Sequence, residues 1–307
     1  MVYSAISDSD NTVSQFTRRE SIKLSHSGAL TDYQKKITIP YKSAMQADFD
    51  DIRFVTSAGE HIPYWLESKT NSSTADVWIM NDYVTGDTYI WMYYGNSGLS
   101  SGSDGDDVFE LHDDFEGTSL DTAKWEEIGT GGVSVSDSEC HITGNGCGGS
   151  HGHRGIIGKT AYGYGYAVEF MVKTDSIAGN SWGGWSSIDN VNSVRVIEGS
   201  NDNAYHASTE SGGIYAYSIA LDTQYHRISI SRVSSSSIKY DYDYGEDPYE
   251  LTNTTYIPTV DLLPQLTNWI PGVDSWVDWV IIRKYIATEP TYTIGAEQHQ
   301  RRVPQIM

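Results

Sequence analysis

Short runs in which apolar and polar residues alternate recur along the whole chain, with little competing helical periodicity. Val168, Phe170 and Val172 form one such series, and Ile228 and Ile230 alternate with serines in another. Successive side chains of a β-strand point to opposite faces, so this alternation predicts strands with one buried face. Turn residues separate the runs, and many short strands at this spacing are typical of sandwiches and barrels. We therefore predict an all-β fold.

A stretch rich in glycine, serine and aspartate, Gly98–Asp107, is the best candidate for a domain boundary. It cannot supply a buried strand, so we predict a linker or a long loop there. The resulting division has four parts. They are an N-terminal segment of residues 1–15 that could serve as a docking arm, a β-sandwich domain of residues 16–112, a second β-domain of residues 113–297, and a C-terminal tail of residues 298–307.

The chain is strongly acidic, with 41 acidic and 20 basic residues and a net charge of -21. This charge repels phosphate backbones and anionic lipids, which argues against nucleic acid and membranes as partners. No apolar run approaches the roughly 18 residues of a membrane span. The first 15 residues lack the basic start and apolar run of a secretory signal. We therefore expect either a mature fragment or a protein that reaches the exterior without secretion, as a virion component does.

Four stretches of the first part carry a family resemblance. They are Leu30–Tyr33, Asp50–Phe54, Ile62–Glu67 and Ile90–Asn96. With this ordered set, roughly residues 15–112 resemble an uncharacterised β-domain family that recurs in archaeal, bacterial and viral surface proteins. The resemblance implies a surface location and carries no enzymatic activity with it.

The second part resembles a concanavalin-A-like, laminin-G-like jelly roll. Asp114–Trp125 is similar to the first strand and turn of that fold, and Ser275–Tyr285 is similar to its last strand. The span between them has the length of a two-sheet sandwich. Together the two resemblances imply a small β-sandwich domain followed by a concanavalin-A-like jelly-roll sandwich.

Catalysis finds little support in the sequence. Glycosidases on this fold use a strand with the pattern Glu-x-Asp-x-x-Glu, which places a nucleophile and a general acid on one face. That spacing is absent here, and Glu169 alone cannot perform a two-carboxylate mechanism. We therefore predict no enzymatic activity and keep a polysaccharide hydrolase as the third hypothesis.

Aromatic residues beside glycines are the candidate ligand-binding residues, because glycans are held by stacking on aromatic rings and by polar groups directed at their hydroxyls. For any single ring, packing in the core is the stronger interpretation, whereas the cluster as a whole favours a binding surface. The candidates are Trp182, Trp185, Tyr162, Tyr164, Tyr205 and Tyr215.

The jelly-roll resemblance also implies a structural calcium ion. In such folds an aspartate of the closing strand meets the opening strand, and Asp278 matches that position. Asp114 and Glu116 could add carboxylate oxygens, which suit Ca²⁺ better than zinc. Alternatively, Asp278 pairs with an arginine such as Arg283 or caps backbone amides.

Only two cysteines occur, Cys140 and Cys147, on either side of a short glycine-containing segment. Outside the cell a local disulfide between them would close a hairpin. Two reduced thiols are an equally good expectation.

Our leading hypothesis is a non-catalytic adhesion protein that binds cell-surface or environmental glycans, at an extracellular or virion surface, as a viral head or tail fibre does. The competing hypothesis is a structural decoration or assembly subunit, with no sugar site, whose partners are other subunits of a virion or surface layer. A homo-oligomer such as a trimer would suit an adhesin.

Overall fold

The computed structural model describes residues 13–129, 131–144, 154–176, 181–187, 192–199, 204–209, 213–214, 219–220, 223–242, 249–268 and 272–299. In these residues the regular structure is β-strand, apart from the 3-10 turn Val13–Gln15. The prediction of an all-β fold with a small sandwich and a larger jelly-roll sandwich is confirmed, but the larger sandwich is inserted into the smaller one instead of following it. Within the described part of the chain, no helix is long and apolar enough to span a membrane.

The chain forms two compact units, and the second interrupts the first. Unit 1 contains the residues up to Phe109 together with those from Thr288 onward, and unit 2 is Glu110–Ala287. The predicted boundary between residues 112 and 113 therefore lies close to the observed one.

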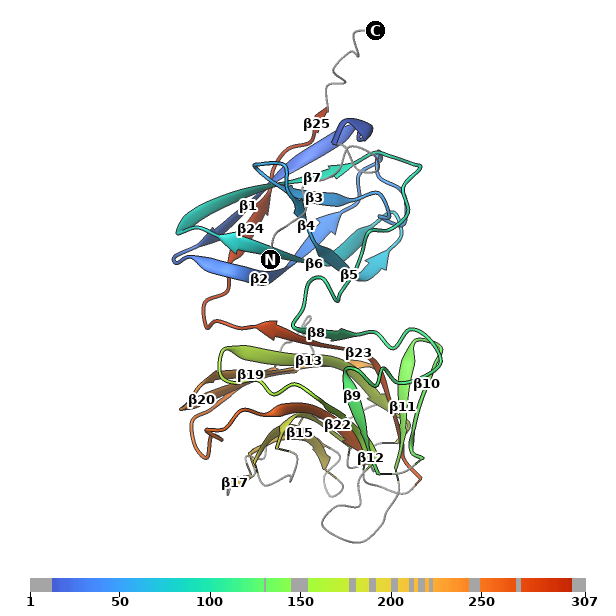
Figure 1. Ribbon diagram of the computed structural model, residues 1–307, viewed down its shortest axis with the longest axis vertical. Helices are drawn as coiled ribbons and strands as arrows, with labels where there is room; N and C mark the ends of the chain where they lie inside the picture. Colours follow the sequence, from blue (N-terminus) through green and yellow to red (C-terminus); the bar gives the residue numbers. More distant parts are fainter. Residues whose placement is uncertain are drawn as a thin grey trace. The chain divides into compact units, whose positions relative to one another are not determined.

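The end of the chain differs from the expected division. Residues 288–297 were expected in the second domain and residues 298–307 in a separate tail. Instead, strands β24 (Thr291–Ile294) and β25 (Gln298–His299) both pair antiparallel with β1 (Arg18–His26) of unit 1 (Figure 1). The open edge of β1 offers unpaired backbone groups, and the returning chain satisfies them.

Unit 1 is a sandwich of two antiparallel sheets (Figure 1). One has the order β24-β1-β7-β3-β4, with β25 also beside β1, and the other has the order β2-β6-β5. Ile22 and Leu24 of β1 and Val77 and Ile79 of β6 are buried, as their alternation predicts. The remaining bounds are β2 (Leu30–Pro40), β3 (Arg53–Thr56), β4 (His61–Ile62), β5 (Tyr64–Thr70), β6 (Thr74–Tyr83) and β7 (Gly86–Tyr94).

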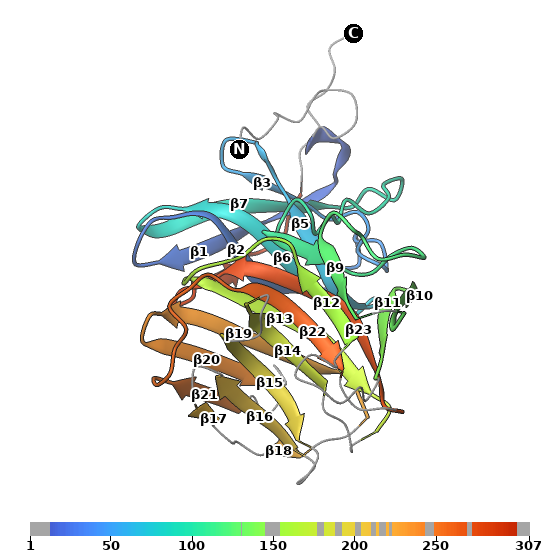
Figure 2. The same ribbon diagram turned by 60° about the horizontal axis from the view of Figure 1, so that its bottom comes forward.

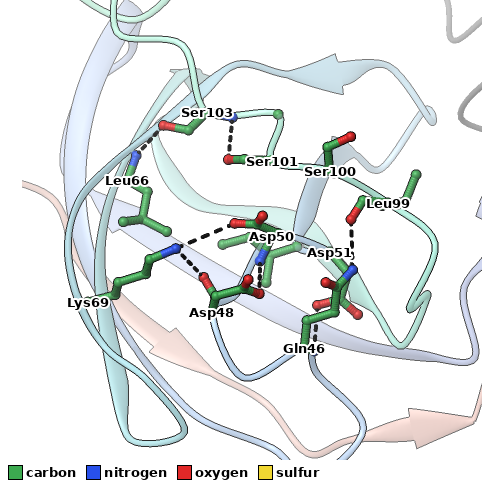
Figure 3. Close-up of polar contacts among 12 residues, drawn as sticks. Gln46, Asp48, Asp50, Asp51, Leu66, Lys69, Leu99, Ser100, Ser101 and Ser103 are labelled. Carbon is green, nitrogen blue, oxygen red and sulfur yellow. Dashed lines mark hydrogen bonds and ion pairs between the residues drawn. The ribbon is translucent and has the colours of Figure 1, made fainter. Parts of the chain in front are cut away.

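The stretch predicted to be a linker or a long loop is a loop of unit 1 that is held by hydrogen bonds (Figure 3). The Oγ of Ser103 accepts a hydrogen bond from the backbone N–H of Leu66 at 2.8 Å, and the carbonyl of Leu99 accepts one from the Gln46 amide at 2.8 Å. The buried guanidinium of Arg53 donates to the carbonyl of Ser100 at 2.7 Å. Glycine and serine here allow close approach to the sheet edge, which composition alone does not separate from a flexible linker.

Unit 2 is a larger sandwich of two antiparallel sheets (Figure 2). The β13 sheet has the order β10-β11-β23-β13-β19-β20-β21, with β8 also paired to β23, and the β14 sheet has the order β17-β16-β15-β14-β22-β12-β9, with β18 beside β16. The bounds are β8 (Leu111–Asp113), β9 (Trp125–Ile128), β10 (Val133–Ser136), β11 (Glu139–Thr143), β12 (Arg154–Gly158), β13 (Tyr166–Thr174), β14 (Ser181–Ser186), β15 (Ser193–Gly199), β16 (Ala204–Thr209), β17 (Gly213–Ile214), β18 (Ile219–Ala220), β19 (His226–Ser234), β20 (Ser237–Tyr242), β21 (Tyr249–Asn253), β22 (Leu263–Asn268) and β23 (Asp274–Lys284).

The core of unit 2 lies between these sheets, where Phe170 of β13 packs against the β14 sheet. A Cβ built on Gly183 would approach the Phe170 ring to 2.4 Å and Leu266 to 2.8 Å. Glycine at this position is therefore required by close packing of the two sheets.

Candidate functional site

The outer face of the β14 sheet carries a group of polar side chains. Val194 and Leu266 belong to the buried core, so the residues beside them in β15 and β22 point to the opposite face of the sheet. We call this group the polar face, and its members are Ser193, Arg195, Gln265 and Thr267.

The strand register places part of the polar face in one row. Gly184 of β14 is the register partner of Arg195 on one side and of Gln265 on the other. The next row places Trp182 of β14 beside Thr267. A Cβ built on Gly184 would approach the carbonyl of Val194 to 2.3 Å and the side chain of Ile230 to 2.8 Å, so close packing requires glycine between these two strands.

Three oxygens of the polar face are buried and unpaired. The side chains of Gln265 and Thr267 are each 2% exposed and that of Ser193 is 0% exposed. Gln265 Oε1, Thr267 Oγ1 and Ser193 Oγ have no hydrogen-bond partner among the described residues. An unpaired buried polar atom costs about 1–3 kcal/mol, so these oxygens favour a hydrogen-bond donor such as water or a ligand, which reaches them only where the atoms that cover them make room.

Two predicted ligand-binding aromatics lie in the core, which corrects the prediction for them. Trp185 is fully buried, and its indole Nε1 donates to the carbonyl of Ile230 across the sandwich at 2.9 Å. Tyr162 packs against Trp185 and its hydroxyl donates to the carbonyl of Glu110 at 3.2 Å. Neither ring can stack on a sugar, because the apolar face that would attract the sugar is already covered by the core.

Tyr164 is half-buried and has a structural role. Its hydroxyl donates to the carbonyl of Pro258 at 3.0 Å, and the guanidinium of Arg232 lies 4.9 Å from its ring centroid. The side chains of Trp182 and Tyr205, and all of Tyr215, lie outside the described residues.

Glu169, the single acidic residue of β13, forms buried ion pairs with two arginines. Its carboxylate contacts both Arg227 and Arg283 on the neighbouring strands. Burial alone would raise the pKa of Glu169, but Arg283 and Arg227 outweigh burial and lower it to about 2. A carboxylate in this state is a poor general acid.

Asp278, the central residue of the predicted calcium site, occupies a β-bulge of β23. The register with β13 jumps there, so Val172 faces Val277 while Met171 faces Trp279. A β-bulge interrupts the regular hydrogen bonding between two strands and changes the direction in which the side chain of the bulged residue points. Arg283 is bound to Glu169, so the alternative pairing of Asp278 with Arg283 is not formed.

The surroundings of Asp278 are acidic. Burial raises its pKa most, and the carboxylates of Glu139 and Asp114 raise it further, whereas Lys173 lowers it. Glu116 is directed elsewhere, because it accepts a hydrogen bond from Ser138 at 2.9 Å. The carboxylate of Asp114 therefore influences the pKa of Asp278, whereas Glu116 is hydrogen-bonded to Ser138.

Metal ligands do not converge in the described part of the chain, where no group of three or more His, Cys, Asp or Glu side chains could hold one ion. An ion beside Asp278 would therefore need backbone oxygens or water as well. Asp113, which the sequence analysis did not select, is the buried acid of the opening segment. It accepts hydrogen bonds from the Trp125 indole at 2.7 Å and from the backbone N–H of Phe115 at 2.9 Å.

Cys140 is a buried free thiol that points into the core of unit 2. Burial, followed by Asp113 and Glu127, raises its pKa to about 12, so the thiol stays protonated and unreactive. Its predicted disulfide partner, Cys147, lies outside the described residues.

Sequence reasoning missed the polar face. Leu263–Asn268 contains a proline and too few β-branched residues to be recognised as a strand. The available signal was the alternation of Gln265 and Thr267 with Leu266, which resembles the pattern of the other strands. In Ser193–Gly199 the corresponding signal was the alternation of Ser193 and Arg195 with Val194 and Val196.

These observations define the class of the protein. It is an all-β protein in which one sandwich is inserted into another and carries polar residues on the outer face of one sheet. Residues 48–128 match the model of a family described as a domain of unknown function (DUF2341). The match starts in unit 1 and ends at β9 of unit 2. This agrees with the expected resemblance of the first part to an uncharacterised domain family, while its surface location stays a prediction. No curated protein matches the chain.

Several solved structures match part of the chain. An uncharacterized protein from Mycobacterium paratuberculosis has 17% identity and a TM-score of 0.47, over 56% of this chain and 99% of that chain. A beta-1,3-glucanase from Mycobacterium marinum has 17% identity and a TM-score of 0.45, over 57% and 98%. An immunostimulatory antigen and pseudo beta-1,3-glucanase of Mycobacterium tuberculosis has 16% identity and a TM-score of 0.45, over 58% and 99%. Likeness at this level says nothing about activity.

Proposed function

We propose that this protein is a non-catalytic adhesion protein of an extracellular or virion surface that binds glycans on the polar face of unit 2. The observation that supports this most is the set of unpaired, buried oxygens of Ser193, Gln265 and Thr267 on one sheet face. Sugar hydroxyls are hydrogen-bond donors and acceptors, so they satisfy such oxygens without bringing a charge into the site.

The other groups of the polar face suit the same ligand class. Arg195 places a permanent cation in the same row as Gln265. Trp182 occupies the register position beside Thr267, and the stacking role expected of it from the sequence stays a prediction. An amide, a guanidinium and hydroxyls are usual components of a site that holds a sugar in one orientation.

A binding role is favoured over hydrolysis by the charges on this face. Two-carboxylate hydrolysis needs a pair of acids about 5–9.5 Å apart. The outward positions of β15 carry Ser193 and Arg195, which cannot act as nucleophile and general acid in that mechanism. Glu169 is neutralised by two arginines, so its carboxylate is already committed.

The test is a glycan array probed with the whole chain and with the double variant Gln265→Ala, Thr267→Val. We expect binding by the wild type and loss of that binding in the variant, because its two hydrogen-bonding oxygens are removed. Thr291→Val, the same chemical change at an exposed position of unit 1, is the matched control and should bind like the wild type. The melting temperature of each variant verifies folding.

A folded wild-type protein that binds no glycan would contradict the proposal. That result would favour the competing role, a decoration or assembly subunit whose surfaces contact other proteins. Unchanged binding by the folded double variant would instead remove the polar face as the site.

A further inference from the structure

A cleft opens at one lateral edge of unit 2, where β12 separates its edge strand β9 from β22 of the polar face. It has a volume of about 590 Å³, within the range of roughly 300–1,000 Å³ that is typical of ligand pockets. It lies between β9, the edge strand of the β14 sheet, and β10, the edge strand of the β13 sheet. The segment Thr118–Thr122 and Lys159 supply further lining.

The sequence explains why the sandwich is open here. β9 and β10 are consecutive in the chain yet belong to different sheets, so the connection between them crosses from one layer to the other. Gly129 and Gly131 in this connection have φ angles of +80° and +69°, which favour glycine. The two edge strands pair only with β12 and β11, and their other edges lack a strand among the described residues.

The floor of the cleft is apolar and its walls are polar. Leu120 and Val133 are half-buried and pack against the core, so they present apolar surface to the cleft. Ser134, Ser119 and Thr118 are exposed hydroxyl residues of the walls.

Two carboxylates and one ammonium complete the lining. Glu127 accepts a hydrogen bond from the backbone N–H of Gly132 at 3.2 Å, which fixes one of its oxygens. The ammonium of Lys159 donates to the carbonyl of Thr122 and closes one end. Glu126 is exposed beside them.

We propose that this edge cleft is a second carbohydrate site, which takes a neutral saccharide. A sugar ring has an apolar C–H face, which suits Leu120 and Val133, and a rim of hydroxyls, which suits carboxylates and the serine and threonine hydroxyls. The inference shares its ligand class with the proposed function but rests on entirely different residues. Glu126 and Glu127 in a chain of net charge -21 disfavour sugars that carry carboxylates or sulfates.

The two sites together would make a single copy of the chain bivalent for a polysaccharide. Linked sites raise the apparent affinity through effective concentration, without any new contact at either site. The affinity of the protein for long neutral glycans would then exceed its affinity for short fragments by more than either site alone provides.

The experiment compares Ser134→Trp with Ser136→Trp by isothermal titration and by glycan array, using the whole chain and neutral oligosaccharides. Both serines are exposed residues of β10, but only Ser134 lines the cleft. Indole at position 134 fills the cleft, so we expect at least one neutral glycan to bind about tenfold more weakly. Ser136→Trp should bind it like the wild type.

The polar-face double variant Gln265→Ala, Thr267→Val separates this inference from the proposed function. Glycan binding that survives in this variant and disappears on adding Ser134→Trp supports the cleft even if the polar face fails. Binding that is lost in the double variant and unchanged in Ser134→Trp overturns the cleft and leaves the proposed function intact.

A less bulky change guards against misfolding of Ser134→Trp. Glu126→Gln with Glu127→Gln keeps the shape of both side chains and removes their charges. We expect this variant to lose affinity for neutral glycans and to lose discrimination against anionic ones. Unchanged affinity and unchanged discrimination in the folded variant also overturn the proposal.

Discussion

Glu169 is a buried charged residue whose partners are also buried. It is 1% exposed, lies in the centre of the β13 sheet, and contacts Arg227 and Arg283 on either side. A buried carboxylate is tolerated only where opposite charges compensate for its lost hydration. The arrangement fixes three adjacent strands relative to one another, so its effect is on stability.

We predict that Glu169→Gln lowers the free energy of unfolding by about 3 kcal/mol at neutral pH. The pKa of Glu169 is lowered to about 2 from 4.5. A lowered carboxyl pKa contributes stability that is present above pH 4.5 and is lost as the pH falls through about 2. Urea titrations across this range should show that slope in the wild type and lack it in the variant. Glu250→Gln, in an exposed pair with Lys239, should cost less than about 1 kcal/mol.

Trp185 gives a second prediction at the residue scale. Trp185→Phe should cost about 1 kcal/mol for the lost hydrogen bond to Ile230, plus a contribution from the smaller ring. Glycan binding by the folded variant should be unchanged, because the indole faces the core. Thermal unfolding and the glycan array measure the two effects separately. A variant of wild-type stability that loses glycan binding would show that Trp185 is a ligand residue after all.

At the scale of elements, the edge of β1 depends on the last strands of the chain. β24 covers Ile22–Ser25, and Glu297 accepts a hydrogen bond from the Tyr94 hydroxyl at 2.8 Å and pairs with Arg18 at 3.3 Å. Two backbone ladders and several side-chain contacts therefore hold the returning segment.

We predict that a chain ending at Ala287 loses amide protection in Arg18–His26, because the hydrogen bonds to β24 and β25 are gone. Hydrogen exchange with mass spectrometry should show faster exchange in β1 and unchanged exchange in β13. β13 is the internal control, since its partners β19 and β23 both remain. Equal protection of β1 in both chains would mean that the pairing contributes nothing to unit 1.

The comparison of sequence and structure also belongs to the elements. Alternation of apolar with polar residues predicted β13 and β19, although β19 buries both of its faces over His226–Arg232. It could not assign β24, whose pattern in Thr291–Ile294 alternates between exposed and half-buried residues and lacks a buried position. The pairing of β24 with β1 links residues that are far apart in the chain, and no local pattern encodes that partner.

The candidate site was less predictable than the fold for a related reason. Trp185 and Tyr162 have the composition of a sugar platform, but the direction of a side chain depends on which strand face meets the second sheet. Gln265 and Arg195 come into one row only through the register of β14, which lies between their strands. Residue type suggested the ligand class, whereas tertiary pairing determined which residues form the face.

At the scale of the whole molecule, the net charge of -21 sets a background against which any specific ion effect must be measured. Mutual repulsion opposes folding, so the screening by dissolved ions relieves part of this repulsion whatever the identity of the cation. Repulsion between carboxylates also acts at Asp278, whose pKa is raised by burial and by the charges of Glu139 and Asp114. A cation bound there would relieve repulsion that bulk salt reaches poorly.

We predict that Ca²⁺ raises the melting temperature of the protein more than Mg²⁺ does at equal ionic strength, because Ca²⁺ accepts irregular oxygen sets and Mg²⁺ demands a strict octahedron. Asp278→Asn should abolish the difference between the two ions. The variant should also melt higher than the wild type in a chelator: a raised carboxyl pKa means that ionisation costs stability as the pH rises, and asparagine removes that cost. Equal shifts with both ions in the wild type would reduce the calcium effect to screening, and a chelator-treated variant that melts lower would assign Asp278 a stabilising contact instead.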